Sequence, residues 1–203
     1  MRAVGLLCVL LLMPVVIACG SDEAGVRAHA VAVERVDLDR AVRVARGRGL
    51  TVQLPGGWSR AHESLTPSLI DPREVLSVGT APLRYRATEC AHMPGAALED
   101  LGPADAFVTL QERGLDPSST WPDFPPRPAH FGPELGGRSE ASECVPSARV
   151  TDHWFAFSDT GRHFHALVAF GPHAPPAVRD QAWGILDSLL VDPGVRPDWR
   201  SSG

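Results

Sequence analysis

Two parts of the chain alternate between apolar and polar positions in the paired way that is typical of β-hairpins. In the first, residues 41–45 and 50–54 alternate around the polar segment RGRG, and the segment PGGW ends the second strand. In the second, residues 148–157 and 163–170 alternate on either side of SDTGR, whose aspartate and glycine suit a turn. A further strand is expected over residues 74–80. Together these patterns predict an antiparallel sheet.

Two other segments carry apolar residues at helical spacing. Within residues 103–114, Pro103 suits a first helical turn, an apolar stripe follows and Gly114 provides a stop, so a short amphipathic helix is predicted. A second amphipathic helix is predicted over residues 177–190. Residues 115–131 hold too many prolines for a sheet interior, and we predict a surface loop there. The aromatic residues expected to pin this loop are Trp121, Phe124 and Phe131.

These elements indicate the α+β class, with an antiparallel β-sheet on which two or more helices pack. A single globular α+β domain is expected over residues 41–192, and a loose tail over residues 193–203.

The N-terminus has the three regions of a secretory signal peptide: a positive charge, an apolar stretch and a small residue before the cut. The apolar stretch, residues 3–18, is shorter than the roughly 20 residues of a membrane-spanning helix. It ends in Val-Ile-Ala-Cys, the order of a bacterial lipobox, so residues 1–18 are predicted to be a lipoprotein signal peptide. Cys19 is the predicted lipid attachment residue, and residues 19–40 are interpreted as a tether.

The charge balance of the chain excludes one class of partner. The formal net charge is −5, and loss of the signal peptide, which holds one arginine and no acid, would make it −6. A nucleic-acid-binding domain needs a basic face, so no nucleic-acid partner is expected. All 19 cationic side chains are arginines, and five of them fall in residues 34–48. That segment is either a solvated strand edge or a surface that rests against anionic lipid headgroups.

The remaining cysteines form a pair. Cys8 lies in the signal peptide and Cys19 takes the lipid, which leaves Cys90 and Cys144. In an exported chain such a pair predicts a disulfide.

Candidate chemistry is sparse. The chain has no GxSxG, P-loop, HExxH or GxGxxG motif. His163 and His165 fall on one face of a predicted strand, about 7 Å apart. Two imidazoles on a strand are either solvated or part of a zinc site, for which Asp152 or His153 on the partner strand would supply a further ligand.

The run Ser158, Asp159, Thr160 near these histidines is more simply explained as turn chemistry than as part of a catalytic triad, so no catalytic residue is assigned.

Two motifs carry a resemblance to known proteins. The opening GLTVQLPGGW and the closing AWGILDSLLVDP, which bound the region from about residue 50 to 191, resemble small actinobacterial lipoproteins of uncharacterised function. The strand followed by Pro-Gly-Trp and the helix followed by Ser-Leu also resemble the PsbP-like α/β/α sandwich. The long proline loop and the cysteine pair depart from that pattern. The resemblance implies a binding or accessory role at a membrane surface and carries over no catalytic residue.

We therefore expect a lipoprotein on the extracytoplasmic side of the cell membrane, held there by its lipid, with a non-catalytic binding or accessory role. Its partner would be an envelope protein or a ligand, bound by the sheet face or the proline-rich loop. The alternative is an envelope metal-binding protein or hydrolase that uses the His163/His165 face, with zinc as its cofactor.

Overall fold

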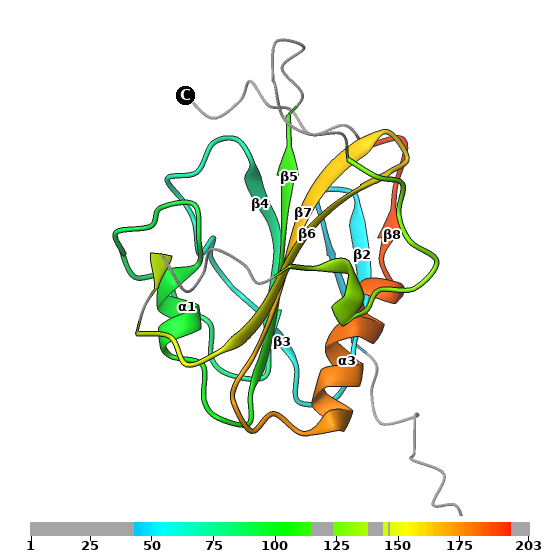
Figure 1. Cartoon of the computed structure of the whole chain (residues 1–203). Helices are drawn as coiled ribbons and strands as arrows, with labels where there is room; N and C mark the ends of the chain where they lie inside the picture. The colour runs from blue at the N-terminus through cyan, green and yellow to red at the C-terminus, as the bar shows by residue number, and fades with distance from the viewer. Residues whose placement is uncertain (1–42, 115–123, 138–143, 146, 196–203) are drawn as a thin grey trace, which may run out of the picture. The chain divides into compact units, whose positions relative to one another are not determined.

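A computed structural model of the chain describes residues 43–114, 124–137, 144–145 and 147–195 (Figure 1). All of them belong to one structural unit, which spans residues 37–203. The predicted signal peptide, Cys19 and the tether lie outside the described residues, and so do Trp121 and residues 196–203 of the predicted tail.

In the described part of the chain, the larger of two antiparallel sheets has five strands in the order β3-β4-β5-β7-β6. Its members are β3 (Ser59–Arg60), β4 (Arg73–Gly79), β5 (Ala106–Arg113), β6 (Thr151–Asp159) and β7 (Arg162–Phe170). The central strand β5 pairs with β4 on one side and β7 on the other.

The smaller sheet has three strands in the order β1-β2-β8. They are β1 (Arg43–Gly47), β2 (Leu50–Leu54) and β8 (Leu190–Val191). The helical segments of the described residues are α1 (Gly95–Glu99), η1 (Pro133–Leu135) and the longer α3 (Pro176–Asp187). The α+β class predicted from the sequence is confirmed, although the strands divide between two sheets. None of the helices in the described parts of the chain is long and apolar enough to cross a membrane.

Hydrophobic cores lie on both faces of the five-stranded sheet. On one face, alternate residues of β6 and β7 pack with the inner residues of β2 and with α3, around Phe157 and Phe164. On the other face, Phe107 and Leu167 pack with α1 and the loops around it. Figure 1 shows α1 on one side of this sheet and the small sheet with α3 on the other. The centre of the large sheet is therefore covered on both faces.

The predicted helix over residues 103–114 is wrong, because this segment forms the central strand β5. Seven of its eight residues are buried, because both faces of the strand are covered. Such a strand lacks the alternation of apolar and polar residues by which a strand is predicted. Its apolar residues therefore fell by coincidence on a helical stripe. The short helix α1 was not predicted. The helix predicted over residues 177–190 is confirmed as α3, but it ends at Asp187, and Leu190 belongs to the strand β8.

Both predicted hairpins are confirmed, and each has a two-residue turn with positive φ at both positions. The turns are Arg48-Gly49 (φ 52° and 71°) and Thr160-Gly161 (φ 50° and 76°). Such turns match the twist of the strands they join. The second connection is thus shorter than the predicted five-residue turn, because β6 and β7 continue further into it.

The described end of the proline-rich segment, residues 124–131, runs along the surface beside β6. It joins β6 through Ser158, whose N–H donates to the Pro125 carbonyl at 2.7 Å and whose carbonyl accepts from the Arg127 N–H at 2.8 Å. Phe131 is buried in the core around Phe157 and Phe164, and Phe124 is half-buried, as expected of residues that hold the loop against the domain.

Candidate functional site

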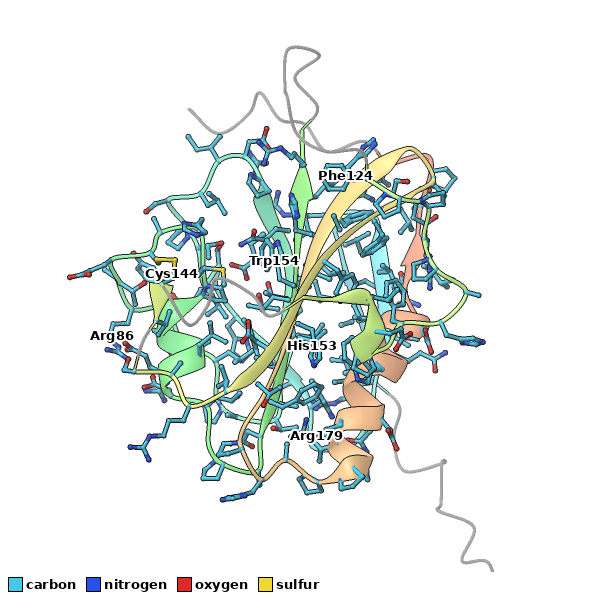
Figure 2. All side chains as sticks on the ribbon, viewed as in Figure 1. Arg86, Phe124, Cys144, His153, Trp154 and Arg179 are labelled. Carbon is cyan, nitrogen blue, oxygen red and sulfur yellow. A yellow bond between two sulfur atoms is a disulfide. The ribbon has the colours of Figure 1, made fainter. Side chains whose placement is uncertain are left out.

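The predicted histidine pair lies on the α1 side of the large sheet, in contact with aromatic rings. The Phe124 ring centroid is 5.1 Å from that of His163 and 5.0 Å from that of His165. The His165 ring also stacks on Trp154 at 5.4 Å, and Figure 2 shows Phe124 and Trp154 along this strand pair. His165 is only 7 % exposed, so it is not the solvated side chain that the sequence allowed.

Burial sets the protonation of this imidazole. Desolvation lowers the pKa of His165 from 6.5 to about 4, and the positive charge of Arg113 adds to the effect. His165 is therefore neutral at physiological pH.

Neither residue suggested as a further zinc ligand lies beside the pair. His153 is opposite Val168, so it projects from the other face, where it contacts Trp183 with a centroid separation of 5.4 Å. Asp152 shares the face of His165 but is opposite Ala169, about 13 Å further along the strand. Within the described ranges, no third ligand that would make a metal site with His163 and His165 is found.

The turn residues near the histidines have structural partners. The Asp159 carboxylate accepts from Arg127 Nη1 at 3.0 Å, and the Ser158 hydroxyl lies 3.2 Å from the Pro125 carbonyl, to which it donates. These contacts favour the turn interpretation over a catalytic one.

The Cys90–Cys144 disulfide is present, with a Cα–Cα distance of 5.5 Å. His92 Nε2 lies 3.5 Å from Cys144 Sγ. The ligand atoms of these three residues fall within 4.8 Å of one another. Because the two sulfurs are bonded to each other, His92 is the only metal ligand that these three residues can supply. Figure 2 shows the disulfide on the α1 side of the molecule.

A surface that the sequence indicated only in part lies around the small sheet. We call it the arginine edge and define it by the exposed residues Arg43, Arg46, Arg48 and Arg60. Three come from β1 and its turn. The fourth comes from β3, the edge strand of the other sheet, and its Nη1 donates to the Arg46 carbonyl at 2.7 Å.

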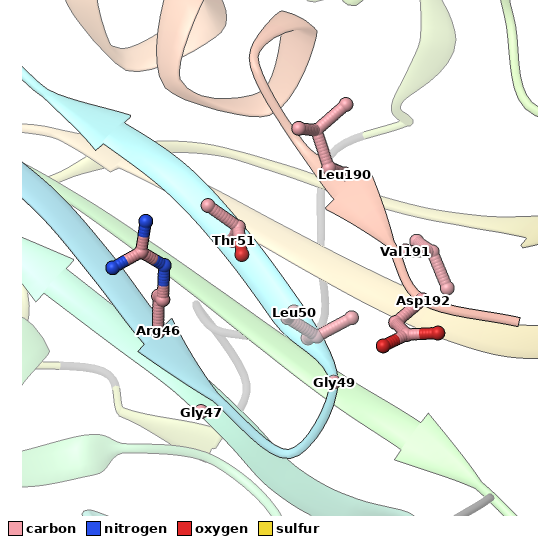
Figure 3. Close-up of a pocket in the computed structure, with 8 residues that line it drawn as sticks. All are labelled: Arg46, Gly47, Gly49, Leu50, Thr51, Leu190, Val191 and Asp192. Atoms are coloured by element: carbon pink, nitrogen blue, oxygen red, sulfur yellow. The ribbon is translucent and has the colours of Figure 1, made fainter. Parts of the chain in front are cut away.

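Three adjoining hollows follow this edge. The first, about 460 Å³, is lined by Arg46, Thr51 and Leu190 together with their neighbours on the three strands (Figure 3). The second, about 600 Å³, shares Arg46 with the first and adds Arg43 and Arg60. The third, about 140 Å³, shares Arg60 with the second and includes Arg48. Arg46 thus lines the first two hollows, and Arg60 lines the second and third.

Within the described ranges, the four guanidinium groups have no carboxylate partner. Arg43 donates to the Trp58 carbonyl and Arg60 to that of Arg46, which are uncharged acceptors.

Among the described residues that line the three hollows, carboxylates occur only at the two ends, where Asp192 lines the first hollow and Glu63 and Glu74 line the third. Glu74 is engaged by neighbouring hydroxyl and N–H donors, including Ser77 Oγ at 2.6 Å. The middle of the edge is thus a concentration of positive charge on a net-negative chain.

Sequence reasoning found the arginines of residues 34–48 but not Arg60, which follows the PGGW segment as an unremarkable polar residue. Only the packing of β3 beside β1 brings it to this surface. The sequence matches no protein-family model and no curated protein.

Proposed function

We propose that the protein is a lipoprotein anchored through Cys19 on the extracytoplasmic side of the cell membrane, where its globular domain has a non-catalytic binding role. The lipobox order before Cys19 supports the anchor. The disulfide between Cys90 and Cys144 supports export, because such bonds persist in oxidising compartments.

The binding surface in this proposal is the arginine edge, and the ligand is an anion that carries phosphate groups. The observation that carries the proposal is the set of four exposed arginines that lie around neighbouring hollows and have no carboxylate partner among the described residues. Guanidinium groups bind phosphate oxygens through paired, charge-assisted hydrogen bonds. Because Arg46 and Arg60 both line the second hollow, a phosphate bound there would have two guanidinium groups beside it.

A catalytic role receives less support from the geometry. His165 is packed between two aromatic rings, stacked on Trp154 and edge-to-face with Phe124, and the Asp159 carboxylate is paired with Arg127. A hydrolase or metal function at His163 and His165 would instead require stoichiometric zinc in the purified protein, lost when both histidines are changed to alanine.

Two measurements on the protein purified from its membrane in detergent test the proposal. Intact-mass analysis should find the chain beginning at a lipid-modified Cys19, and an unmodified chain that begins at Met1 would overturn the anchor. Inorganic polyphosphate should bind the protein in low salt, as followed by calorimetry.

Matched variants then locate the polyphosphate site. The pair R46Q/R60Q should weaken binding about tenfold or more, since each removes a charge-assisted contact. The control pair R84Q/R149Q removes the same charge from exposed positions outside the edge and should leave binding nearly unchanged. Equal losses in both pairs, or no binding at all, would overturn the assignment of this surface.

A further inference from the structure

We propose that the arginine edge, together with the outer face of the small sheet, docks on the anionic bilayer that holds the lipid anchor. This inference rests on the proposed function and names its ligand: the phosphate groups of anionic lipids in the same membrane.

The outer face of the small sheet has the composition of a membrane-contacting surface. Arg46, Thr51 and Leu190 are direct neighbours across the three strands, so their side chains share this face (Figure 3). Leu190 is 67 % exposed, and Val44, two residues from Arg46 on the same face, is 47 % exposed. Aliphatic side chains beside arginines suit the boundary between headgroups and acyl chains.

A phosphate-bearing polymer in solution would use the arginines but would leave these two aliphatic side chains in water. Their exposure therefore favours a bilayer as the occupant.

The course of the chain places this surface next to the anchor. The described structure begins at Arg43, the first residue of β1, and 23 residues, 20 to 42, separate it from Cys19. Fully extended, such a segment spans at most about 80 Å. A lipid at Cys19 would thus keep the arginine edge at a high effective concentration relative to the bilayer, so that weak contacts suffice for docking.

Charge would also select the orientation. The chain is net negative, so an anionic bilayer repels most of the domain while it attracts the edge with four arginines that form no ion pair with any described residue. Each arginine near an anionic surface strengthens attachment about fivefold at ordinary ionic strength. The domain is therefore expected to lie with the small sheet toward the membrane and with α1 away from it.

The test uses the lipidated full protein, reconstituted into vesicles of phosphatidylcholine alone or with phosphatidylglycerol. The anchor holds the protein in both, so only docking differs between them. Arginines are modified with a dicarbonyl reagent, and the rate at each site is read by peptide mass spectrometry. Arg46 and Arg60 should react at least about fivefold more slowly on phosphatidylglycerol vesicles. Arg84 and Arg149 should react at equal rates on both.

High salt tests the electrostatic part of the docking, and a substitution at Leu190 tests the part due to aliphatic side chains. Protection should disappear in 1 M salt, where the Debye length is about 3 Å. The variant L190S should keep the fold, because Leu190 is exposed. Its loss of an aliphatic contact with the bilayer should lower the protection of Arg46. Equal protection at Arg84 and Arg149 would mean unspecific adsorption and would overturn the proposal.

The polyphosphate experiment separates the two levels of the proposal. If polyphosphate binds but phosphatidylglycerol gives no protection, membrane docking is overturned and the anion-binding role remains, with a soluble envelope polymer as its ligand. If neither occurs, both the docking and the assignment of the arginine edge as the binding surface are overturned.

Discussion

Arg162 and Glu112 form a bidentate ion pair inside the protein. Arg162 Nε lies 2.6 Å from Glu112 Oε1, and its Nη2 lies 2.7 Å from Oε2. The two side chains are only 6 % and 2 % exposed. Arg162 Nη2 also donates to the Arg48 carbonyl at 3.0 Å. The pair therefore fastens the turn of the small sheet, and with it the arginine edge, to the centre of the large one.

Removing one partner of this pair should destabilise the folded protein. E112Q leaves the Arg162 charge buried without a counter-charge, so we expect the free energy of unfolding to fall by about 3 to 5 kcal/mol. Denaturant unfolding measures it. The control R86Q breaks an exposed pair with Glu99 and Asp100 and should cost less than about 1 kcal/mol. Similar costs for the two variants would contradict the role given to the buried pair.

Loss of the disulfide should also destabilise the domain. Cys90 and Cys144 are 54 residues apart. In the chain-entropy model, a closed loop of that length raises the free energy of the unfolded chain by about 4 kcal/mol, because it reduces the conformational entropy of that chain. We expect C90A/C144A to lower the free energy of unfolding by about this amount. The wild-type protein under reducing conditions should approach the stability of the variant, and an unchanged midpoint in both would contradict the expectation.

Stability should depend on pH through His165. Its pKa is about 4 in the folded protein against 6.5 in the unfolded chain, because burial disfavours the charged imidazole. Below pH 6.5 the unfolded chain binds the proton first, so stability falls as the pH drops from about 6.5 to about 4 and this contribution levels off below that. The full loss is at most about 3 kcal/mol.

The pH dependence can be assigned by substitution. H165F should remove the slope between about pH 6.5 and 4, while H173Q, which changes an exposed histidine, should keep it. A slope that survives in H165F would show that another group is responsible.

The C-terminal end of α3 should depend on one arginine from the proline-rich segment. Arg127 donates to the carbonyls of Leu189 at 2.6 Å and Asp187 at 2.9 Å, which the helix itself leaves unpaired. We expect R127M to lower the free energy of unfolding by about 2 kcal/mol, because it removes a charged donor from several acceptors. Hydrogen exchange should locate the change.

The faster exchange should be confined to the last turn of α3. R179M is the matched control, since Arg179 donates to a single carbonyl, that of Ala174, at the other end of the helix. Equal acceleration in both variants would indicate general destabilisation rather than loss of a cap.

The zinc alternative shows why a site is harder to predict than a strand. The sequence correctly placed His163 and His165 on one face of their strand. It could not give the register of the neighbouring strand, and a slip of one residue exchanges the faces. The actual register places His153 opposite Val168, on the other face from the histidine pair.

What the sequence determined by itself lies in contiguous stretches. The two hairpins follow from alternation and from turns that end in Gly49 and Gly161, where positive φ is favourable. The cysteine pair and the helix α3 could likewise be predicted from residue types and spacing. Only the tertiary structure decided that residues 106–113 form a strand and that Arg60 joins Arg46 at one edge. Burial on both faces and contacts between distant segments decide such features, and neither leaves a periodic signal in the local sequence.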